Sequence, residues 1–253
     1  MRRPDVAARL DPSQQAAADA GEKAMMPIRG DVPFLDYLLS SLADAGIAEV
    51  CLVVPPEAAR IRARYANPSR LSIAFAAQAE PRGSAEALLA AEAFVGGEEF
   101  LSLNSDNYYP FSAYRALREL GEPGLPAFER DLLVEKSNFP LERVAGYALL
   151  DVGPDGYLRG IVEKPDPAAI APGRKALVSM NLWRFRRSIF EACRCLEPSS
   201  RGEKEIPQAV ALAIARRIES FRTVFCADGV LDLSTRADVA SAAERLRGIE
   251  VLV

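Results

Sequence analysis

Short apolar runs alternate with helical segments along the first hundred residues, and this alternation is what most restricts the fold of the chain. Residues 48–56, 71–78 and 100–104 are short apolar runs, typical of strands covered on both faces. Residues 33–46 and 84–96 have the spacing and flanking signals of helices, with Ser84 as the expected cap of the second. Strands and helices that alternate at such short intervals predict an α/β fold, with a parallel sheet and helices on both faces.

The second half of the chain changes character. Residues 145–165 contain two strand-like runs joined by Gly153-Pro154-Asp155-Gly156, whose chemistry is that of a hairpin turn. Another strand, two helices, a last strand region at 223–234 and a closing helix are expected after it. The sequence shows no internal repeat, no low-complexity tract and no domain linker. We therefore expect a single domain over residues 1–253.

Composition excludes several classes of function. The formal net charge of −4 leaves no electrostatic footprint for nucleic acid. No apolar stretch approaches the roughly 18 residues of a membrane span, and the first residues lack the apolar core of a secretory signal, so a cytoplasmic protein with reduced thiols is expected. Histidine is absent. Mechanisms that need a histidine base are thereby removed, and carboxylates, lysine, arginine and backbone amides remain.

Two aspartates stand at the ends of apolar runs. Asp106 follows the run 100–104, and Asp232 ends the run 230–232. An aspartate in this position also makes a turn or a helix cap without any chemistry. In parallel sheets, however, ligands bind beyond the carboxyl ends of the strands, and Mg²⁺ commonly takes one or two carboxylates plus substrate phosphates. From the residues alone both interpretations of Asp106 stay open, a turn or cap and a metal site shared with Asp232.

Other polar residues follow strand-like runs, and each has two interpretations. The amide of Gln78 can pair with a nucleobase edge and Gly83 lets a backbone come close, although glycine is common in any strand-to-helix loop. Glu163 and Lys164 are either a solvated strand end or an acceptor for sugar hydroxyls beside a point charge for a phosphate. Lys23 precedes an apolar run and by itself is typical of a surface lysine.

Taken in order, these segments resemble the sugar-1-phosphate nucleotidyltransferase family, the enzymes that make nucleotide sugars. No single motif is specific, but the ordered set is, and it spans nearly the whole chain. The matching segments are KAMMPI (23–28), PFLDYLLSSLADAGIAEVCLVV (33–54), QAEPRGSAEAL (78–88), LNSDNYY (103–109), GYALLDVGPDGYLRGIVEKP (146–165), VSMNLWRF (178–185) and GVLDLST (229–235).

The resemblance implies a doubly wound α/β fold, with a mixed, mainly parallel sheet and a small β-hairpin appendage for the sugar. It also implies a Mg²⁺-dependent transfer of a nucleotidyl group from an NTP to a sugar-1-phosphate, with release of pyrophosphate. Such a step needs positioning and charge neutralisation far more than proton transfer, so the lack of histidine is no obstacle. The base, the sugar and the oligomeric state, a homo-oligomer included, stay open. The residue roles that it implies are catalysis for Lys23 and Asp106, Mg²⁺ binding for Asp106 and Asp232, base binding for Gln78 and Gly83, sugar binding for Gly146, Glu163 and Asn181, and sugar-phosphate binding for Lys164.

The start of the chain departs from the family pattern. The family opens with a strand and a glycine-rich loop, roughly G-x-G-T-R-[LM]-x-P, whose amides cradle the triphosphate. Nothing of that kind precedes Lys23, and Met1-Arg2-Arg3-Pro4 resembles the tail of the motif. Either the true start lies upstream, or the nucleotide site is impaired, and we expect little transferase activity from the chain as given. The alternative function is a non-catalytic sugar-nucleotide-binding or regulatory protein of the same fold.

Overall fold

A computed structural model describes residues 10–144, 146–163, 176–199 and 202–253. Its helices are α1 (Pro12–Asp19), η1 (Lys23–Met25), α2 (Phe34–Asp44), α3 (Ala59–Arg64), α4 (Ser84–Ala90), α5 (Glu92–Val95), α6 (Phe111–Glu119), α7 (Arg130–Lys136), α8 (Leu141–Val144), α9 (Ser188–Arg194), α10 (Ile206–Ala215) and α11 (Ala237–Arg245). Its strands are β1 (Pro27–Arg29), β2 (Val32–Pro33), β3 (Glu49–Val54), β4 (Ser72–Ala77), β5 (Phe100–Ser102), β6 (Asn107–Tyr108), β7 (Gly124–Glu129), β8 (Ala148–Val152), β9 (Leu158–Val162), β10 (Leu177–Ser179), β11 (Trp183–Phe185), β12 (Arg222–Cys226) and β13 (Leu231–Asp232). Within these residues no helix is long and apolar enough to cross a membrane.

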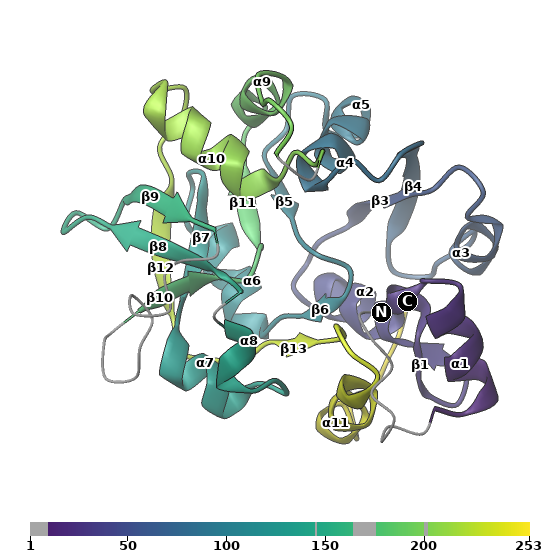
Figure 1. Cartoon of the computed structure of the whole chain (residues 1–253). Coiled ribbons are helices and arrows are strands. Elements are labelled where there is room, and N and C mark those ends of the chain that lie inside the picture. Colours follow the sequence, from purple (N-terminus) through teal and green to yellow (C-terminus); the bar gives the residue numbers. More distant parts are fainter. Residues whose placement is uncertain (1–9, 145, 164–175, 200–201) are drawn as a thin grey trace.

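The strands form one large sheet and three separate pairs. The large sheet has the order β5-β11-β7-β10-β8-β9, with β12 paired to β7. The separate pairs are β1 with β2, β3 with β4, and β6 with β13. Figure 1 shows β3 and β4 apart from the large sheet, with α4, α9 and α10 together along one end of the molecule.

The predicted α/β class and the mixed sheet are confirmed, but parallel pairing takes a smaller share than the alternation of strands and helices suggests. Among the described strands the parallel pairs are β3 with β4 and β7 with β12, and the other named pairs are antiparallel. Among the described strands of the large sheet, only the antiparallel pair β8 with β9 joins consecutive strands through a tight turn. The other antiparallel pairs, such as β5 with β11 and β7 with β10, join strands far apart in the sequence, so their direction follows from the tertiary arrangement.

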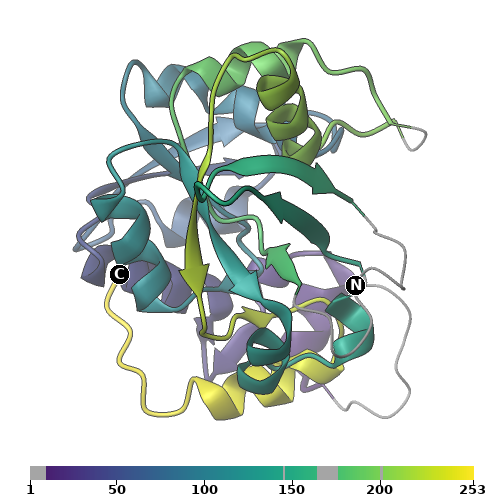
Figure 2. The ribbon, with the colours of Figure 1, turned by 90° about the vertical axis from the view of Figure 1, so that its left-hand side faces the viewer.

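The predicted hairpin is present as β8 and β9. Its turn closes by a hydrogen bond from Gly156 N to Gly153 O (2.9 Å), and Gly156 has a φ of 79°, which suits glycine. The hairpin continues the large sheet beyond β10 and does not stand apart from it. Figure 2 shows the two strands of the hairpin lying across the molecule below the α9 and α10 end. The appendage expected for the sugar is therefore the end of the main sheet.

Strand β3 is less covered than its apolar sequence predicts. Residues Val50–Val53 are half-buried rather than buried. The physical reason is that, among the described residues, β3 pairs only with β4, so one edge and part of each face lack a neighbouring strand.

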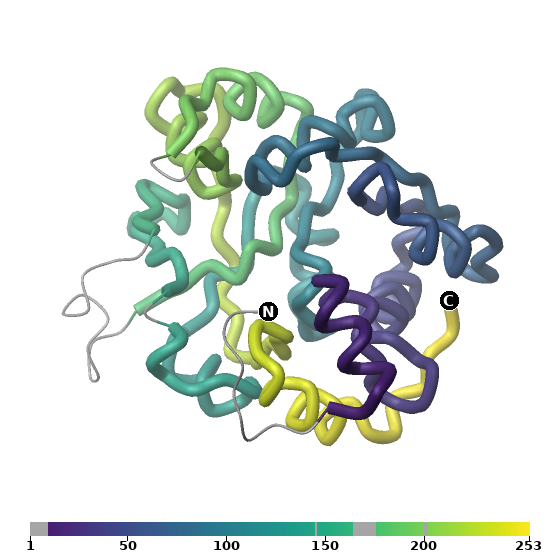
Figure 3. The backbone as a smooth tube through the Cα atoms, turned by 45° about the vertical axis from the view of Figure 1, so that its right-hand side comes forward, coloured from purple at the N-terminus to yellow at the C-terminus, as the bar shows by residue number. Residues whose placement is uncertain are grey.

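The apolar side chains gather into three clusters, and one of them joins the two ends of the described chain. Ala17 of α1 and Phe34 of α2 are fully buried in one cluster with Val239 and Ala242 of α11. Figure 3 shows the N-terminal and C-terminal segments side by side. This packing also brings the segment around Lys23 and the strand β13 to the same part of the molecule, where the predicted metal ligands lie.

Candidate functional site

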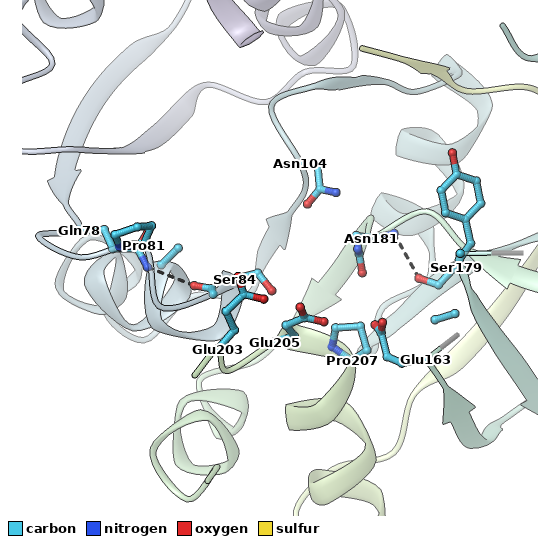
Figure 4. A pocket seen from close by; sticks show the side chains of 15 residues that line it. Gln78, Pro81, Ser84, Asn104, Glu163, Ser179, Asn181, Glu203, Glu205 and Pro207 are labelled. Carbon is cyan, nitrogen blue, oxygen red and sulfur yellow. Dashed lines mark hydrogen bonds between the residues drawn. The ribbon is translucent and has the colours of Figure 1, made fainter. Parts of the chain in front are cut away.

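Five of the predicted substrate-binding residues line one pocket with a volume of about 480 Å³. They come from segments far apart in the sequence and are Gln78, Gly83, Gly146, Glu163 and Asn181. Figure 4 shows Gln78 and Ser84 on one side of this pocket and Glu163 and Asn181 on the other. The sixth predicted residue, Lys164, lies outside the described residues.

At one side of the pocket, the loop after β4 has a defined shape. Gln78 N donates to Val54 O (2.9 Å), which continues the pairing of β4 with β3, and the Gln78 Nε2 donates to Gly83 O (3.1 Å). Gly83 has a φ of 104°, and a Cβ at this position would lie 2.7 Å from Lys204 N and closer still to Lys204 O. Only glycine fits this backbone conformation beside this neighbour.

The segment before α10 holds this loop in place, and sequence reasoning missed it. Lys204 N donates to Arg82 O (2.8 Å), and Ala85 N donates to Lys204 O (3.0 Å). Ser84 is the first residue of α4 and not its cap; its hydroxyl accepts a hydrogen bond from Ile206 N (2.9 Å). The predicted cap was wrong because a tertiary neighbour takes the hydroxyl.

Two further acidic residues come to the pocket with the same segment. Glu203 and Glu205 line the pocket beside Glu163. Glu205 also caps α10 through a reciprocal pair of bonds with Gln208. The only sequence feature that could have indicated Glu203 and Glu205 is the pair of acidic residues within 203–205. An ordinary solvent-exposed loop has the same composition, so this feature does not distinguish a binding site from a loop. The carboxylates of Glu203 and Glu205 are acceptors suited to hydroxyl groups.

The opposite side of the pocket is built by the strand ends of the large sheet. Asn181 follows β10 with a φ of 55°, which asparagine adopts more readily than most residues. Its N donates to Ser179 Oγ (3.1 Å), and its Oδ1 accepts from Trp183 Nε1 (3.4 Å). Glu163 lies just after β9, and Ser179 also lines the pocket. The first bond holds the main chain at Asn181, and the second orients its side-chain amide, which lines the pocket.

The predicted acids Asp106 and Asp232 are brought together by an antiparallel strand pair. Asn107 of β6 pairs with Asp232 of β13, and Leu233 N donates to Asp106 O (3.0 Å). Lys23 Nζ lies 3.3 Å from Asp106 Oδ2, so the predicted catalytic pair is also in contact. Segments more than 80 residues apart in sequence thus meet at one point of the fold.

Asp232 is buried within a network of hydrogen bonds. Its Oδ2 accepts from Arg143 Nη1 (2.9 Å) and its Oδ1 from Asn107 Nδ2 (3.3 Å). Burial raises the pKa of the Asp232 carboxyl above its usual value; the Ser234 hydrogen bond opposes this, and the charge of Asp106 adds to it. Arg143 is a residue that sequence reasoning missed, because nothing in its local sequence points to a carboxylate 89 residues away.

The acidic pair and the pocket belong to one continuous site. Asn104 lines the pocket, and its Nδ2 donates to Asn107 Oδ1 (3.3 Å), which is the same side chain that bonds Asp232. On the other side, Gly146 lines the pocket and its N donates to Arg143 O (3.0 Å). Two short chains of contacts therefore connect the pocket to the carboxylate of Asp232.

The donor set fits a magnesium ion of the kind that phosphate chemistry uses. Among the described residues no three acidic or cysteine side chains converge to make a complete cage. Asp106 precedes β6 and Asp232 ends its partner strand β13, the charge of Asp106 acts on the Asp232 carboxyl, and 28% of the Asp106 side chain is exposed to solvent. Because Mg²⁺ commonly keeps several waters and binds through one or two carboxylates plus substrate phosphates, this incomplete set is a chemically reasonable site.

Comparison with known proteins agrees with this geometry. The nucleotidyl transferase family matches residues 18–245, a range that contains the pocket, Lys23 and both aspartates. The chain belongs to the nucleotidyl transferase family. The predicted family is thereby confirmed.

Two relatives in the nucleotidyl transferase family have names that specify glucose-1-phosphate as a substrate. The chain is 30% identical over 180 residues to the glucose-1-phosphate thymidylyltransferase of Streptomyces antibioticus, covering 70% of this chain but 48% of that protein. It is 28% identical over 229 residues to the UTP–glucose-1-phosphate uridylyltransferase AglF of Haloferax volcanii, covering 89% of this chain and 88% of that protein. The chain thus spans about half the length of the Streptomyces relative and most of the Haloferax one.

A solved structure has the same fold as this chain. A UDP-glucose pyrophosphorylase complexed with UDP-glucose superimposes with a TM-score of 0.68 at 19% identity, covering 88% of this chain and 89% of that one. At that identity the likeness concerns the fold alone, and it supports the predicted α/β class.

Proposed function

We propose that the chain is a Mg²⁺-dependent nucleotidyltransferase that transfers a nucleotidyl group from an NTP to a sugar-1-phosphate and releases pyrophosphate. The observation that carries the proposal is the connection of the pocket to the Asp106–Asp232 pair through Asn104 and Asn107. A pocket with amide and carboxylate groups suits a base and a sugar, and a neighbouring pair of carboxylates suits the phosphates between them.

In this proposal one side of the pocket binds the nucleotide base and the other side binds the sugar. Gln78 and Gly83 bind the base, since one presents an amide and the other allows close backbone approach. Glu163 and Asn181 accept and donate hydrogen bonds to the sugar hydroxyls, and Gly146 supplies a wall without a side chain. Lys164 follows directly on Glu163, and we assign it to the phosphate of the sugar.

The reaction needs charge neutralisation and alignment. An oxygen of the sugar-1-phosphate attacks the α-phosphorus of the NTP, a new phosphorus–oxygen bond forms, and pyrophosphate leaves with the electron pair of the broken bond. Lys23 neutralises phosphate charge from its position 3.3 Å from Asp106. A divalent cation held by Asp106 and Asp232 supplies further charge neutralisation at the phosphates. No side chain has to move a proton in this step.

The substrates that we propose follow from the relatives. The thymidylyltransferase and uridylyltransferase names point to dTTP or UTP as nucleotide and to glucose-1-phosphate as acceptor. We also propose a cytoplasmic setting, in keeping with the four free cysteines.

Release of pyrophosphate tests this function. The chain is assayed with dTTP, UTP, CTP, ATP and GTP against glucose-1-phosphate and related sugar phosphates, with and without Mg²⁺. We expect turnover with dTTP or UTP that needs Mg²⁺ and disappears in Asp106→Asn. Asp44→Asn is the matched control, because Asp44 is also an acid in an ion pair, with Arg70 (2.7 Å), and lies outside the pocket.

The outcomes separate the two candidate functions. Nucleotide or nucleotide-sugar binding without any turnover would favour the non-catalytic binding protein. The low turnover expected from the sequence stays a prediction, and the same assay measures it.

A further inference from the structure

We propose that Arg143, together with Asp238, is a positioning residue that holds the carboxylate of Asp232 in the orientation in which it binds a divalent cation. The inference rests on the proposed metal role of Asp232 and goes beyond it, because it assigns a function to two residues outside the predicted site. Arg143 lies on α8 and Asp238 on α11, so three elements meet at the end of β13.

The guanidinium of Arg143 bridges two buried carboxylates. Its Nη1 lies 2.9 Å from Asp232 Oδ2 and 2.9 Å from Asp238 Oδ2, and its Nη2 lies 2.9 Å from Asp238 Oδ1. Asp232 is 5% exposed and Asp238 is 3% exposed. A planar guanidinium presents its N–H groups in a rigid fork, so a carboxylate that it holds has a defined direction as well as a neutralised charge.

Asp238 is itself fixed to the backbone around it. Thr235 N donates to Asp238 Oδ2 (2.6 Å), and Ser241 Oγ donates to Asp238 O (3.1 Å). The bidentate pair between Arg143 and Asp238 is therefore anchored on α11. This anchoring fixes the position of the Arg143 guanidinium, whose third hydrogen bond goes to Asp232.

The remaining bonds of Asp232 leave room for a cation. Asn138 accepts from Asp232 N (2.8 Å) and donates to Asp232 O (2.9 Å), which holds the main chain. Asn107 Nδ2 donates to Asp232 Oδ1 (3.3 Å). Each carboxylate oxygen has two acceptor positions. Arg143, Asn107 and Ser234 each occupy one of these four positions, so one position stays available for a cation.

The charge of the cluster agrees with a positioning role. A single arginine beside a metal ligand would repel the metal, but the charge of Arg143 is cancelled by the bidentate Asp238. The three side chains together keep one negative charge, that of Asp232. Partners that orient a metal ligand in this way commonly affect metal affinity by about 10–100-fold.

The test removes the groups that orient the Asp232 carboxylate and leaves the net charge of the cluster unchanged. The double variant Arg143→Met with Asp238→Asn loses one positive and one negative charge, so the cluster still carries the charge of Asp232 alone. The affinity for Mn²⁺ alone is measured from the free-ion signal in electron paramagnetic resonance, and the unfolding temperature is measured in EDTA. We expect Mn²⁺ binding to weaken about 10–100-fold.

A matched control isolates this effect from lost stability. Arg64 of α3 forms two hydrogen bonds to Asp36 of α2, which is 7% exposed. The variant Arg64→Met with Asp36→Asn removes an equivalent pair whose side chains, among the described residues, form no hydrogen bond to Asp106 or Asp232. We expect a lower unfolding temperature and an unchanged Mn²⁺ affinity in this control.

A conservative variant gives a second measurement. Arg143→Lys keeps the positive charge, but an ammonium cannot reproduce the fork that joins both carboxylates. We expect its Mn²⁺ affinity to lie between those of the wild type and the double variant, and it serves as the test if the double variant does not fold.

Two results would overturn the positioning role. One is Mn²⁺ affinity equal to the wild type in both Arg143 variants, and the other is an equal loss in the Arg64 control. A wild-type chain whose Mn²⁺ binding is absent, or unaffected by Asp106→Asn, is a different failure. It would refute the proposed metal site first, and the role of Arg143 with it.

Discussion

The ammonium group of Lys23 lies 3.3 Å from the carboxylate of Asp106, although 83 residues separate the two in sequence. Both side chains are partly exposed, 32% for Lys23 and 28% for Asp106. Ion pairs at such exposure stabilise a fold by about 0–1 kcal/mol. A contact of this kind is not needed for folding, and its place beside Asp232 favours a role in binding phosphates.

Replacement of Lys23 separates activity from stability. We expect Lys23→Ala to lower kcat by roughly 10²–10³-fold, as the loss of one preorganised donor does, and to change the free energy of unfolding by less than about 1 kcal/mol. Pyrophosphate release and urea unfolding measure the two effects. Lys136→Ala is the control, because Lys136 also pairs with an aspartate, Asp228 (3.7 Å), at a half-exposed position. Equal kcat values in the two variants would contradict the catalytic role.

Gly83 is expected to resist substitution for two reasons, and Gly96 separates them. Both have positive φ, at 104° and 60°, which costs an L-residue roughly 1–3 kcal/mol. Around Gly96 a Cβ would meet nothing within 4 Å, whereas at Gly83 it would meet the Lys204 backbone. We therefore expect Gly83→Ala to lose more stability than Gly96→Ala, and also to weaken nucleotide binding in calorimetry. Gly96→Ala with a loss as large as that of Gly83→Ala would show that the Lys204 contact is unimportant.

Lys164 gives a prediction that rests on the sequence. We expect Lys164→Ala to weaken sugar-1-phosphate binding far more than NTP binding, because the change removes one point charge from one phosphate. Calorimetry with each ligand separately gives the two affinities. Losses of similar size for both ligands would indicate that Lys164 supports the fold and does not contact the phosphate.

The cysteines provide a test that is independent of any substrate. Cys195 is exposed, whereas burial raises the pKa of Cys193 to about 12 and also raises the pKa of Cys226 and of Cys51. Since the thiolate is the reactive form, we expect a single fast-reacting thiol toward a disulfide reagent at about pH 8. The fast phase should vanish in Cys195→Ser. A second fast phase in the folded protein would show that Cys51, Cys193 or Cys226 is accessible to the reagent as a thiolate, and it would contradict this packing.

Several elements were predictable because their causes are local. The helix at 34–44 has apolar residues at helical spacing, and α1 begins with the capping box of Asp11 and Gln14 and a first-turn proline. The hairpin turn at 153–156 needs only its own glycines. The two aspartates were singled out as candidates in the same way, because each stands at the end of an apolar run.

Other features depended on partners that no local pattern reveals. Ser84 was expected to cap α4, yet its hydroxyl accepts from Ile206, 122 residues later. Strand β3 was expected to be covered on both faces, and coverage of a strand depends on its neighbours in the sheet rather than on its own sequence. Glu203, Glu205 and Arg143 come to the site only because α10 and α8 pack where they do.

The amino-acid sequence alone indicated the family and the elements around the site, and it singled out Asp106, Asp232, Gln78 and Glu163 as candidates, because propensity, capping and strand-end chemistry act over a few residues. The tertiary structure decided which of these side chains meet. Hydrogen bonds such as Asn107 with Asp232, or Arg143 with both Asp232 and Asp238, join residues up to 125 positions apart. Their geometry depends on how whole elements pack together, and packing is a property of the complete chain.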